Sequence, residues 1–366
     1  MLDEVILTNF KGFKSATIPL APLTLLSGLN SSGKSTVLQS LGVLRQSLEA
    51  GFLDDGSWLL NGPFVELGLG SDVLHEDSDV EELGIGFVQD GARFAWTVSY
   101  SQQADVLETN EISKVTASSA VPFSDRFHFL RADRVNPQTI SAKSRHAVSQ
   151  NRSLGAKGEF AAHFLAIFRD QPVPANIRHP EAPETTPGLL NQVNAWMQEF
   201  SPGVRVDVHD VAGTDFVRLS FTFGSGISES NAYRPTNVGF GVAYSLPIVI
   251  ACLATPADGL VLLENPEAHL HPRGQMAMGR LVALAASAGI QLLVETHSDH
   301  LLNGVRLAVK RGELAASDVK MHFFNRDPAL RQSNFVSPGM QSDGRLTFWP
   351  EGFFDQWDRA LMDLVG

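Results

Sequence analysis

The chain opens with short apolar runs of the kind that form β-strands, and a helical pattern follows them. Three strand-like runs lie near residues 5–7, 16–20 and 23–26, separated by short turns. From residue 34 onward the period changes, and apolar side chains recur every three or four positions on one face: Val37, Leu38, Leu41, Leu44 and Leu48. We therefore expect a strand that leads into a helix through a loop at residues 27–33.

Two continuous apolar runs mark the second half of the chain, at residues 260–263 and 291–294. Because these runs do not alternate with polar residues, they predict strands that are buried on both faces, as in a parallel sheet covered by helices. The segment between them has helical spacing over residues 273–287 and begins just after Pro272, which suits a helix start. The pattern predicts an α/β fold.

The middle of the chain is less regular. Two alternating runs between residues 80 and 100 flank Asp90-Gly91, a pair that favours a β-hairpin turn. Residues 120–205 are polar, with several arginines and lysines and a proline-rich stretch at 180–187. We interpret this region as an inserted, mostly helical arm. Its basic side chains could contact a nucleic-acid backbone or form a solvated surface.

Composition narrows the class of protein. Apolar residues make up 43% of the chain and charged residues 19%, which is typical of a globular protein. The formal net charge of −12 disfavours a nucleic-acid interface over the whole surface, so any such contact must be local. The single cysteine, the acidic start of the chain and the absence of an uninterrupted apolar span predict a cytoplasmic protein without a membrane segment.

The strongest chemical signal is the segment Gly28 to Ser35, which matches the P-loop pattern G-x-x-x-x-G-K-[ST] at every fixed position. Its glycines allow close approach to a phosphate, its N–H groups and lysine attract the anion, and its serine offers a hydroxyl to Mg²⁺. We expect ATP and Mg²⁺ as ligands. The expected nucleotide contacts here are Gly28, Asn30, Ser31, Ser32, Gly33, Lys34, Ser35 and Thr36.

Three further signals follow in the second half of the chain. Glu264 ends the first apolar strand, where a magnesium-binding carboxylate belongs beside Ser35. His297 follows the second strand, at an edge where ligands of α/β sheets bind. A glycine-bearing turn with Asn237, Gly239 and Gly241 precedes an apolar helix, although this signal is weak by itself.

The order of these motifs, with Glu-Asn-Pro-Glu-Ala-His-Leu-His-Pro at 264–272 and Glu-Thr-His-Ser-Asp at 295–299, resembles the ABC-type ATPases related to SMC, RecF and OLD proteins. Within that group the chain is similar to stand-alone bacterial AAA family ATPases that end in a short module of unknown function. The resemblance spans nearly the whole chain. It implies an ABC-type ATPase head with a mixed sheet flanked by helices, and an inserted helical arm.

The resemblance also implies roles for single residues. Asn237, Gly239 and Gly241 of one subunit would face the γ-phosphate bound by the other subunit of an ATP-sandwich dimer. Lys11 and Phe13, in an element matching N-F-K-x-F, would contact the base and ribose. The switch histidine would be His297, and residues 268–272 would form a loop that contacts the partner subunit.

One position departs from many relatives. Where the glutamate that polarises the attacking water usually follows the magnesium-binding acid, this chain has Asn265, and an amide cannot accept a proton as a carboxylate does. Either Glu267 takes over this role, or turnover is slow and ATP acts mainly as a dimerising switch. We expect slow hydrolysis with Glu264, Glu267 and His297 as the catalytic residues.

Other signals receive a structural interpretation. His269 and His271 lie one residue apart on a loop and lack further ligands for a metal site. The acidic segment 77–79 does not follow an apolar strand, and we predict no built-in Toprim nuclease. The aromatic residues between 348 and 357 predict a packed C-terminal cap or, as a second reading, a surface for a partner.

These observations divide the chain into four parts: residues 1–119 and 206–330 as the two halves of the ATPase head, 120–205 as the arm, and 331–366 as the C-terminal module. The first functional hypothesis is an ATPase subunit that dimerises on ATP, or forms a higher oligomer, and controls a separate effector protein such as a nuclease or toxin, in defence against phage. The alternatives are a RecF-like or SMC-like clamp for DNA maintenance, and an ATP-switched scaffold with negligible turnover.

Overall fold

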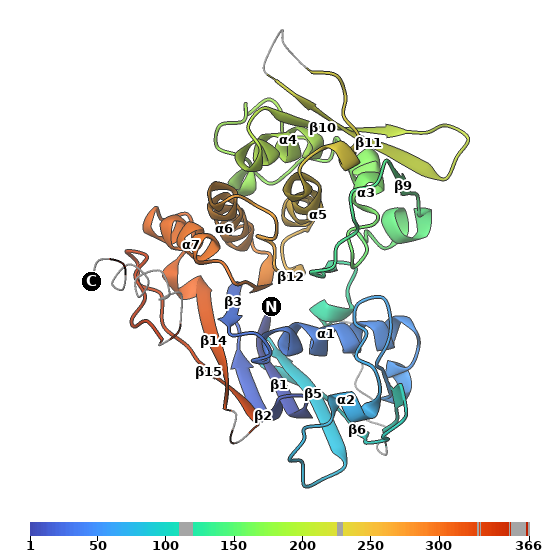
Figure 1. Ribbon diagram of the computed structural model, residues 1–366, viewed down its shortest axis with the longest axis vertical. Helices are drawn as coiled ribbons and strands as arrows, with labels where there is room; N and C mark the ends of the chain where they lie inside the picture. Colours follow the sequence, from blue (N-terminus) through green and yellow to red (C-terminus); the bar gives the residue numbers. More distant parts are fainter. Residues whose placement is uncertain are drawn as a thin grey trace.

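The computed structural model describes residues 1–109, 120–224, 230–327 and 331–350, together with residues 329, 352 and 364. Two large sheets and a group of helices form the head, and a smaller mixed α/β layer lies above it (Figure 1). In this part of the chain no helix is long and apolar enough to cross a bilayer.

A six-stranded sheet forms the centre of the head. Its strands follow the order β15-β14-β3-β13-β12-β8. All neighbouring pairs are parallel except β14 with β15. The bounds are β3 (Leu23–Gly28), β8 (Phe127–Leu130), β12 (Leu260–Glu264), β13 (Gln291–Glu295), β14 (Val319–Asp327) and β15 (Gln332–Val336). The mixed sheet confirms the predicted fold class.

Both faces of this sheet are covered, as the continuous apolar runs predict. Val261 and Leu263 of β12 join one hydrophobic core, which also contains residues of α5, α6 and α7. Leu260 and Leu262 join a second core on the opposite face, with α1. The helices are α1 (Lys34–Glu49), α5 (Phe240–Ala254), α6 (Pro272–Ser287) and α7 (Asp299–Lys310).

An antiparallel sheet, in the order β2-β1-β5-β6, shares the second core with α1. Helix α1 therefore lies between the two sheets (Figure 1). The predicted hairpin is β5 and β6, and Asp90 and Gly91 of its turn both have positive φ. The remaining bounds in this lobe are β1 (Leu2–Phe10), β2 (Phe13–Pro19), β4 (Trp58–Leu59), α2 (Gly70–Val73), β5 (Glu82–Gln89), β6 (Ala92–Ser99) and β7 (Val106–Leu107).

The layer above the head requires a correction of the expected arm boundaries. Strand β8 pairs with β12 in the central sheet, so residue 120 is not where the arm begins. At the other end, β10 (Val204–Asp210) and β11 (Phe216–Phe223) pair with each other, and β11 pairs with β9 (Ile140–Ala142), so this sheet extends past residue 205. Among the described residues of this layer, only α3 (Ala161–Phe168) and α4 (Leu189–Phe200) are regular α-helices. The layer therefore contains both helices and strands, and is not mostly helical as expected, because its strands pack against the apolar faces of these helices.

The C-terminal part also begins differently from the expectation. Strand β15, which the boundary at 331 assigns to a separate module, is an edge strand of the central sheet. After it, the chain returns over α7, where the Arg306 side chain donates to the Gly344 carbonyl (2.8 Å) and lies over the Trp349 ring. Most of the predicted aromatic cap, from Phe353 onward, falls outside the described residues.

Candidate functional site

The loop between β3 and α1 has the backbone of a phosphate-binding turn. Gly28 has a φ of 138°, and a Cβ there would overlap the Phe324 carbonyl group. Gly33, directly before α1, has a φ of 101°, and a Cβ there would lie 2.7 Å from the Phe13 ring. Both positions therefore require glycine. The loop thus packs closely against Phe324 of β14 and Phe13 of β2. A loop of this kind before a helix offers its N–H groups to an anion.

The side chains of the loop are arranged around its own backbone. Lys34 is buried, and its ammonium group donates to the carbonyls of Gly28 (3.1 Å) and Leu29 (2.7 Å). Burial lowers the pKa of Lys34, and the nearby Glu295 opposes this shift. The hydroxyl of Ser32 is buried without a hydrogen-bond partner. A bound phosphate would give both groups an anionic acceptor.

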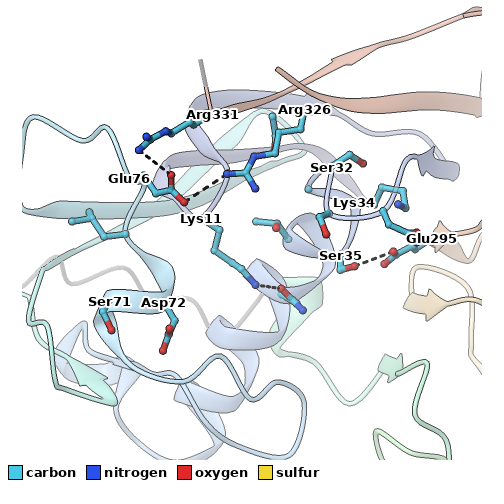
Figure 2. Close-up of a pocket in the computed structure, with 18 of the residues that line it drawn as sticks. Lys11, Ser32, Lys34, Ser35, Ser71, Asp72, Glu76, Glu295, Arg326 and Arg331 are labelled. Atoms are coloured by element: carbon cyan, nitrogen blue, oxygen red, sulfur yellow. Dashed lines mark hydrogen bonds and ion pairs between the residues drawn. The ribbon is translucent and has the colours of Figure 1, made fainter. Parts of the chain in front are cut away.

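A cleft of about 690 Å³ opens beside this loop (Figure 2). Residues 30–36 form one wall, so every predicted P-loop contact except Gly28 lines the cleft. The other walls include Lys11, Gln39, Asp72 and, from the C-terminal part of the chain, Arg326, Arg331 and Ser333. The opening also carries Glu76, which forms ion pairs with Arg326 (3.7 Å) and Arg331 (3.5 Å).

Of the two residues expected near the base and ribose, only Lys11 lines the cleft. Its ammonium group donates to Gln39 (2.8 Å), and burial lowers its pKa. Phe13 is fully buried and packs edge-to-face against Phe324, so the expectation that it contacts nucleotide is wrong. It faces inward because β2 turns its apolar side chains toward the core, where Phe13 supports Gly33 from behind.

Two glutamates lie side by side at the carboxyl edge of the central sheet. Glu264 and Glu295 are direct partners in the register of β12 and β13. The Ser35 hydroxyl donates to Glu295 (2.9 Å), whereas Glu264 accepts from the peptide N–H of Ala132 (2.9 Å). Burial, and then the charge of Glu264, raises the pKa of Glu295 to about 7. Sequence reasoning missed Glu295, although it ends its apolar run as Glu264 ends the preceding one.

Glu267 and His297 meet through the backbone at this edge. The peptide N–H of His297 donates to one carboxylate oxygen of Glu267 (2.8 Å), and the other oxygen is buried without a partner. Burial raises the pKa of Glu267 and lowers that of His297. His297 lines the cleft. Asn265 has a φ of 44°, and its side-chain oxygen is also buried without a partner.

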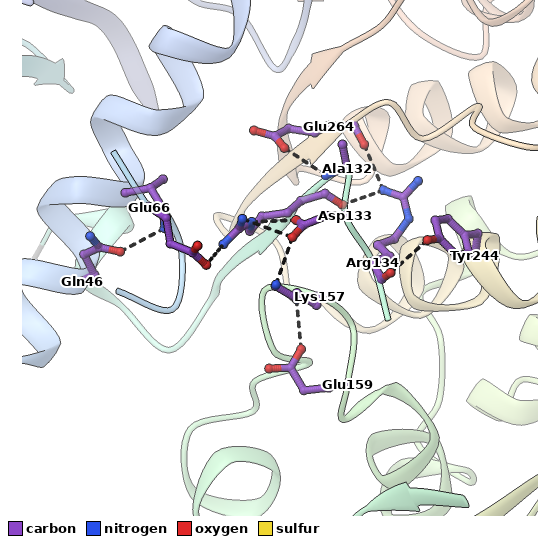
Figure 3. A network of polar contacts seen from close by, with 11 residues as sticks. Gln46, Glu66, Ala132, Asp133, Arg134, Lys157, Glu159, Tyr244 and Glu264 are labelled. Atoms are coloured by element: carbon purple, nitrogen blue, oxygen red, sulfur yellow. Dashed lines mark hydrogen bonds and ion pairs between the residues drawn. The ribbon is translucent and has the colours of Figure 1, made fainter. Parts of the chain in front are cut away.

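Arg134 is a second residue that sequence reasoning did not assign to the site. Its guanidinium is buried and donates to the carbonyls of Arg131, Glu264 and Asn265, each at 2.9 Å (Figure 3). It also lies over the Tyr244 ring of α5, and the Tyr244 hydroxyl donates to the Arg134 carbonyl (3.0 Å). Arg134 thus connects the acidic end of β12 to α5. In the sequence, Arg134 was noticeable only as one of several basic residues between 120 and 205.

The glycine-bearing turn lies away from the cleft. Asn237 and Gly239 are exposed just before α5, and a Cβ at Gly239 would meet no atom within 4 Å. Gly241 packs against the backbone of His269, whose ring lies 5.0 Å from that of Tyr244. None of these residues lines the P-loop cleft.

Comparisons with known families agree with this geometry. A family model described as "AAA domain, putative AbiEii toxin, Type IV TA system" matches residues 23–303, well over half of the chain. The chain belongs to this AAA family. A second model, described as "Protein of unknown function (DUF3696)", matches residues 314–364. A search of the curated proteins finds no match.

The AAA domain has the fold of an SMC head. It is similar to the crystal structure of "the SmcHead bound to the C-winged helix domain of ScpA", with a TM-score of 0.54, 15% identity, and coverage of 92% of this chain and 98% of that one. A Pyrococcus furiosus Smc head with an extended coiled coil, bound to the C-terminal domain of ScpA, matches with a TM-score of 0.50, 13% identity and coverage of 100% and 99%. The resemblance to SMC-like ATPases with a C-terminal module of unknown function is thereby confirmed. Membership of the AAA family implies that the chain binds ATP.

Proposed function

We propose that this AAA-domain protein is a slow, magnesium-dependent ATPase that dimerises on ATP and controls a separate effector. The observation that carries this proposal is the meeting of two strand ends at one cleft, where the P-loop after β3 lies beside Glu295 and His297 from the end of β13. Glu264, at the end of β12, is the register partner of Glu295. The test of the site is Lys34→Ala. We expect it to abolish binding of a fluorescent ATP analogue, and unchanged binding would refute the assignment.

The residues at this edge fit a magnesium ion. Ser35 offers a hydroxyl, and Glu295 and Glu267 each keep a buried oxygen without a partner. Hard oxygen ligands of this kind suit Mg²⁺, which usually retains several waters. The sequence motif suggests Ser35 and Glu264 as its protein ligands. When bound, the ion would neutralise charge on the phosphates of ATP.

Catalysis in this proposal relies on Glu267 and His297. Glu267 is fixed by the N–H of His297, and burial, which raises its pKa, favours a role as proton acceptor. Asn265 cannot accept a proton, which supports slow turnover. The test is the rate of phosphate release from Asn265→Glu. We expect an increase of about tenfold or more, because a general base typically contributes about a hundredfold to ten-thousandfold and Glu267 already supplies part of this. A rate equal to the parent's would show that Asn265 does not limit hydrolysis.

Dimerisation would place the turn before α5 against the ATP of the other subunit. The turn is exposed, and α5 is a 15-residue helix whose N-terminus attracts anions. Gly239 has open space and an ordinary negative φ, so both Gly239→Asp and Gly239→Asn should fold and cap the helix. We expect the aspartate to abolish dimerisation by a non-hydrolysable ATP analogue, because its charge repels the γ-phosphate, and the neutral asparagine to preserve it. Equal dimerisation of both variants, measured by sedimentation, would refute this part.

The link to an effector and to defence is supported by the family's description, which refers to a toxin of a type IV toxin–antitoxin system. The test is purification of the native complex with and without ATP. Recovery of the same nuclease or toxin only in the presence of ATP supports the proposal, and recovery of the ATPase alone under both conditions opposes it.

A second candidate function is a DNA clamp, favoured by the likeness to SMC heads. The net charge of −12 acts against it. Binding to duplex DNA at low salt separates the two functions, because contacts to the DNA backbone are strongest there. No measurable affinity at low salt with ATP present would exclude the clamp.

A further inference from the structure

The glutamate that contacts Ser35 is not the one that the sequence motif assigns to magnesium. The motif places the magnesium-binding acid at the end of β12, which is Glu264. In the structure the P-loop serine instead donates to Glu295, at the end of the neighbouring strand β13 (Figure 2). Glu295 lines the cleft, and Glu264 is not among the residues that do.

The two glutamates also differ in how their oxygens are used. One oxygen of Glu264 accepts from Ala132, in the loop after β8 (Figure 3). Among the residues that the structure describes, Glu295 accepts only the Ser35 hydroxyl through one oxygen, while its other oxygen is buried without a hydrogen-bond partner. The Glu295 side chain is about 95% buried, so water does not readily satisfy that oxygen. A buried carboxylate oxygen without a donor is costly, and a cation would remove the cost.

We propose that Glu295 is the protein carboxylate that binds magnesium beside Ser35, and that Glu264 mainly holds the loop after β8. This inference rests on the proposed function, since it concerns the metal that accompanies ATP. It deepens that function by naming the acid. A serine hydroxyl and one carboxylate, together with phosphate oxygens and water, form an acceptable set of hard ligands for this ion.

A different interpretation is that Glu295 only occupies Ser35 in the absence of nucleotide and withdraws when metal enters. In that case the metal would depend on Glu264, and removing the Glu295 charge would leave metal affinity unchanged or improve it. The two interpretations therefore predict opposite results for which glutamate substitution weakens metal binding more.

The experiment compares Glu295→Gln with the matched variant Glu264→Gln in the full chain. Mn²⁺ is the probe, because its binding to the protein–nucleotide complex can be measured directly by electron paramagnetic resonance with a non-hydrolysable ATP analogue. We expect Glu295→Gln to weaken Mn²⁺ binding by about tenfold to a hundredfold, the range typical for groups that support a metal site. The loss of Mn²⁺ affinity in Glu264→Gln should be severalfold smaller than in Glu295→Gln. Equal effects, or a larger loss in Glu264→Gln, would overturn the proposal.

Binding of the nucleotide without metal separates this inference from the proposed function. In the presence of a chelator, Glu295→Gln should bind the ATP analogue at least as tightly as the parent, because the substitution removes a negative charge near the phosphates. If the parent itself does not bind nucleotide with or without metal, the proposed function fails. If Glu295→Gln does not fold, Glu295→Asp and Glu264→Asp carry the same comparison. The shorter carboxylate should weaken Mn²⁺ binding more at 295, and the reverse order would refute the assignment.

Discussion

Helices α6 and α7 cross with their backbones in contact, and this contact makes a sharp prediction. A Cβ added at Gly279 would overlap the Leu301 carbonyl oxygen and lie 3.0 Å from the Cα of Gly304. A Cβ added at Gly304 would overlap the Met276 carbonyl oxygen. Since the obstructing atoms are backbone, no side-chain rotation can relieve the overlap, and the helices must move apart.

Gly279→Ala should therefore lower the free energy of unfolding by about 1–2 kcal/mol. Overpacking of this kind costs about 1–3 kcal/mol, and the higher helix propensity of alanine returns up to about 1 kcal/mol. The matched control is Gly274→Ala in the same helix, where the new Cβ would lie at an ordinary 3.5 Å from its nearest neighbours. This control should keep or slightly raise the stability.

Urea unfolding of the two variants measures the difference. A double variant, Gly279→Ala with Gly304→Ala, should lose less than the sum of the single losses, because the first substitution already separates the helices. Helices α6 and α7 directly follow the loops that carry Glu267 and His297, so moving the helices apart should shift these residues and phosphate release should also fall in Gly279→Ala. If Gly279→Ala is as stable as Gly274→Ala, the close backbone contact between α6 and α7 does not exclude a side chain at residue 279, and the reasoning is refuted.

Three further predictions address the site and its support. Arg134→Met removes three hydrogen bonds from a buried guanidinium to main-chain carbonyls and should lower the free energy of unfolding by about 3–5 kcal/mol; a loss below about 1 kcal/mol in urea unfolding would contradict the described network. Glu267→Gln should slow phosphate release while ATP binding is retained, and an unchanged rate would remove Glu267 from catalysis. Burial lowers the pKa of His128 from 6.5 to about 4. Between these two pH values His128 is protonated in the unfolded chain but neutral in the folded protein. The contribution of neutral His128 to stability is therefore fully present above pH 6.5 and is lost as the pH falls. The stability of the parent relative to His128→Gln should thus fall by about 1.4 kcal/mol per pH unit between pH 6.5 and about 4, and a difference independent of pH would show that His128 titrates normally in the folded protein.

The local parts of this protein follow from its sequence, and the parts set by distant contacts do not. The P-loop and the buried strands β12 and β13 were predictable because a fixed motif and uninterrupted apolar runs encode them within a few residues. Glu295 and Arg134 were not recognised, because their roles depend on partners at Ser35 and at the end of β12, far away in the sequence. Phe13 was misplaced since a motif position does not tell which way a strand turns its side chain.

The position of β14 shows that the two segments matched by family models share one sheet. Although a separate family model covers residues 314–364, β14 is the strand that hydrogen-bonds to β3 along its length, and the Phe324 carbonyl lies against Gly28. Arg326, Arg331 and Ser333 of the same segment line the P-loop cleft. A chain cut before residue 314 would therefore lose one neighbour of its P-loop strand and one wall of the P-loop cleft. The smallest piece of this protein that can be expected to bind ATP therefore extends past the AAA match and includes β14 and β15.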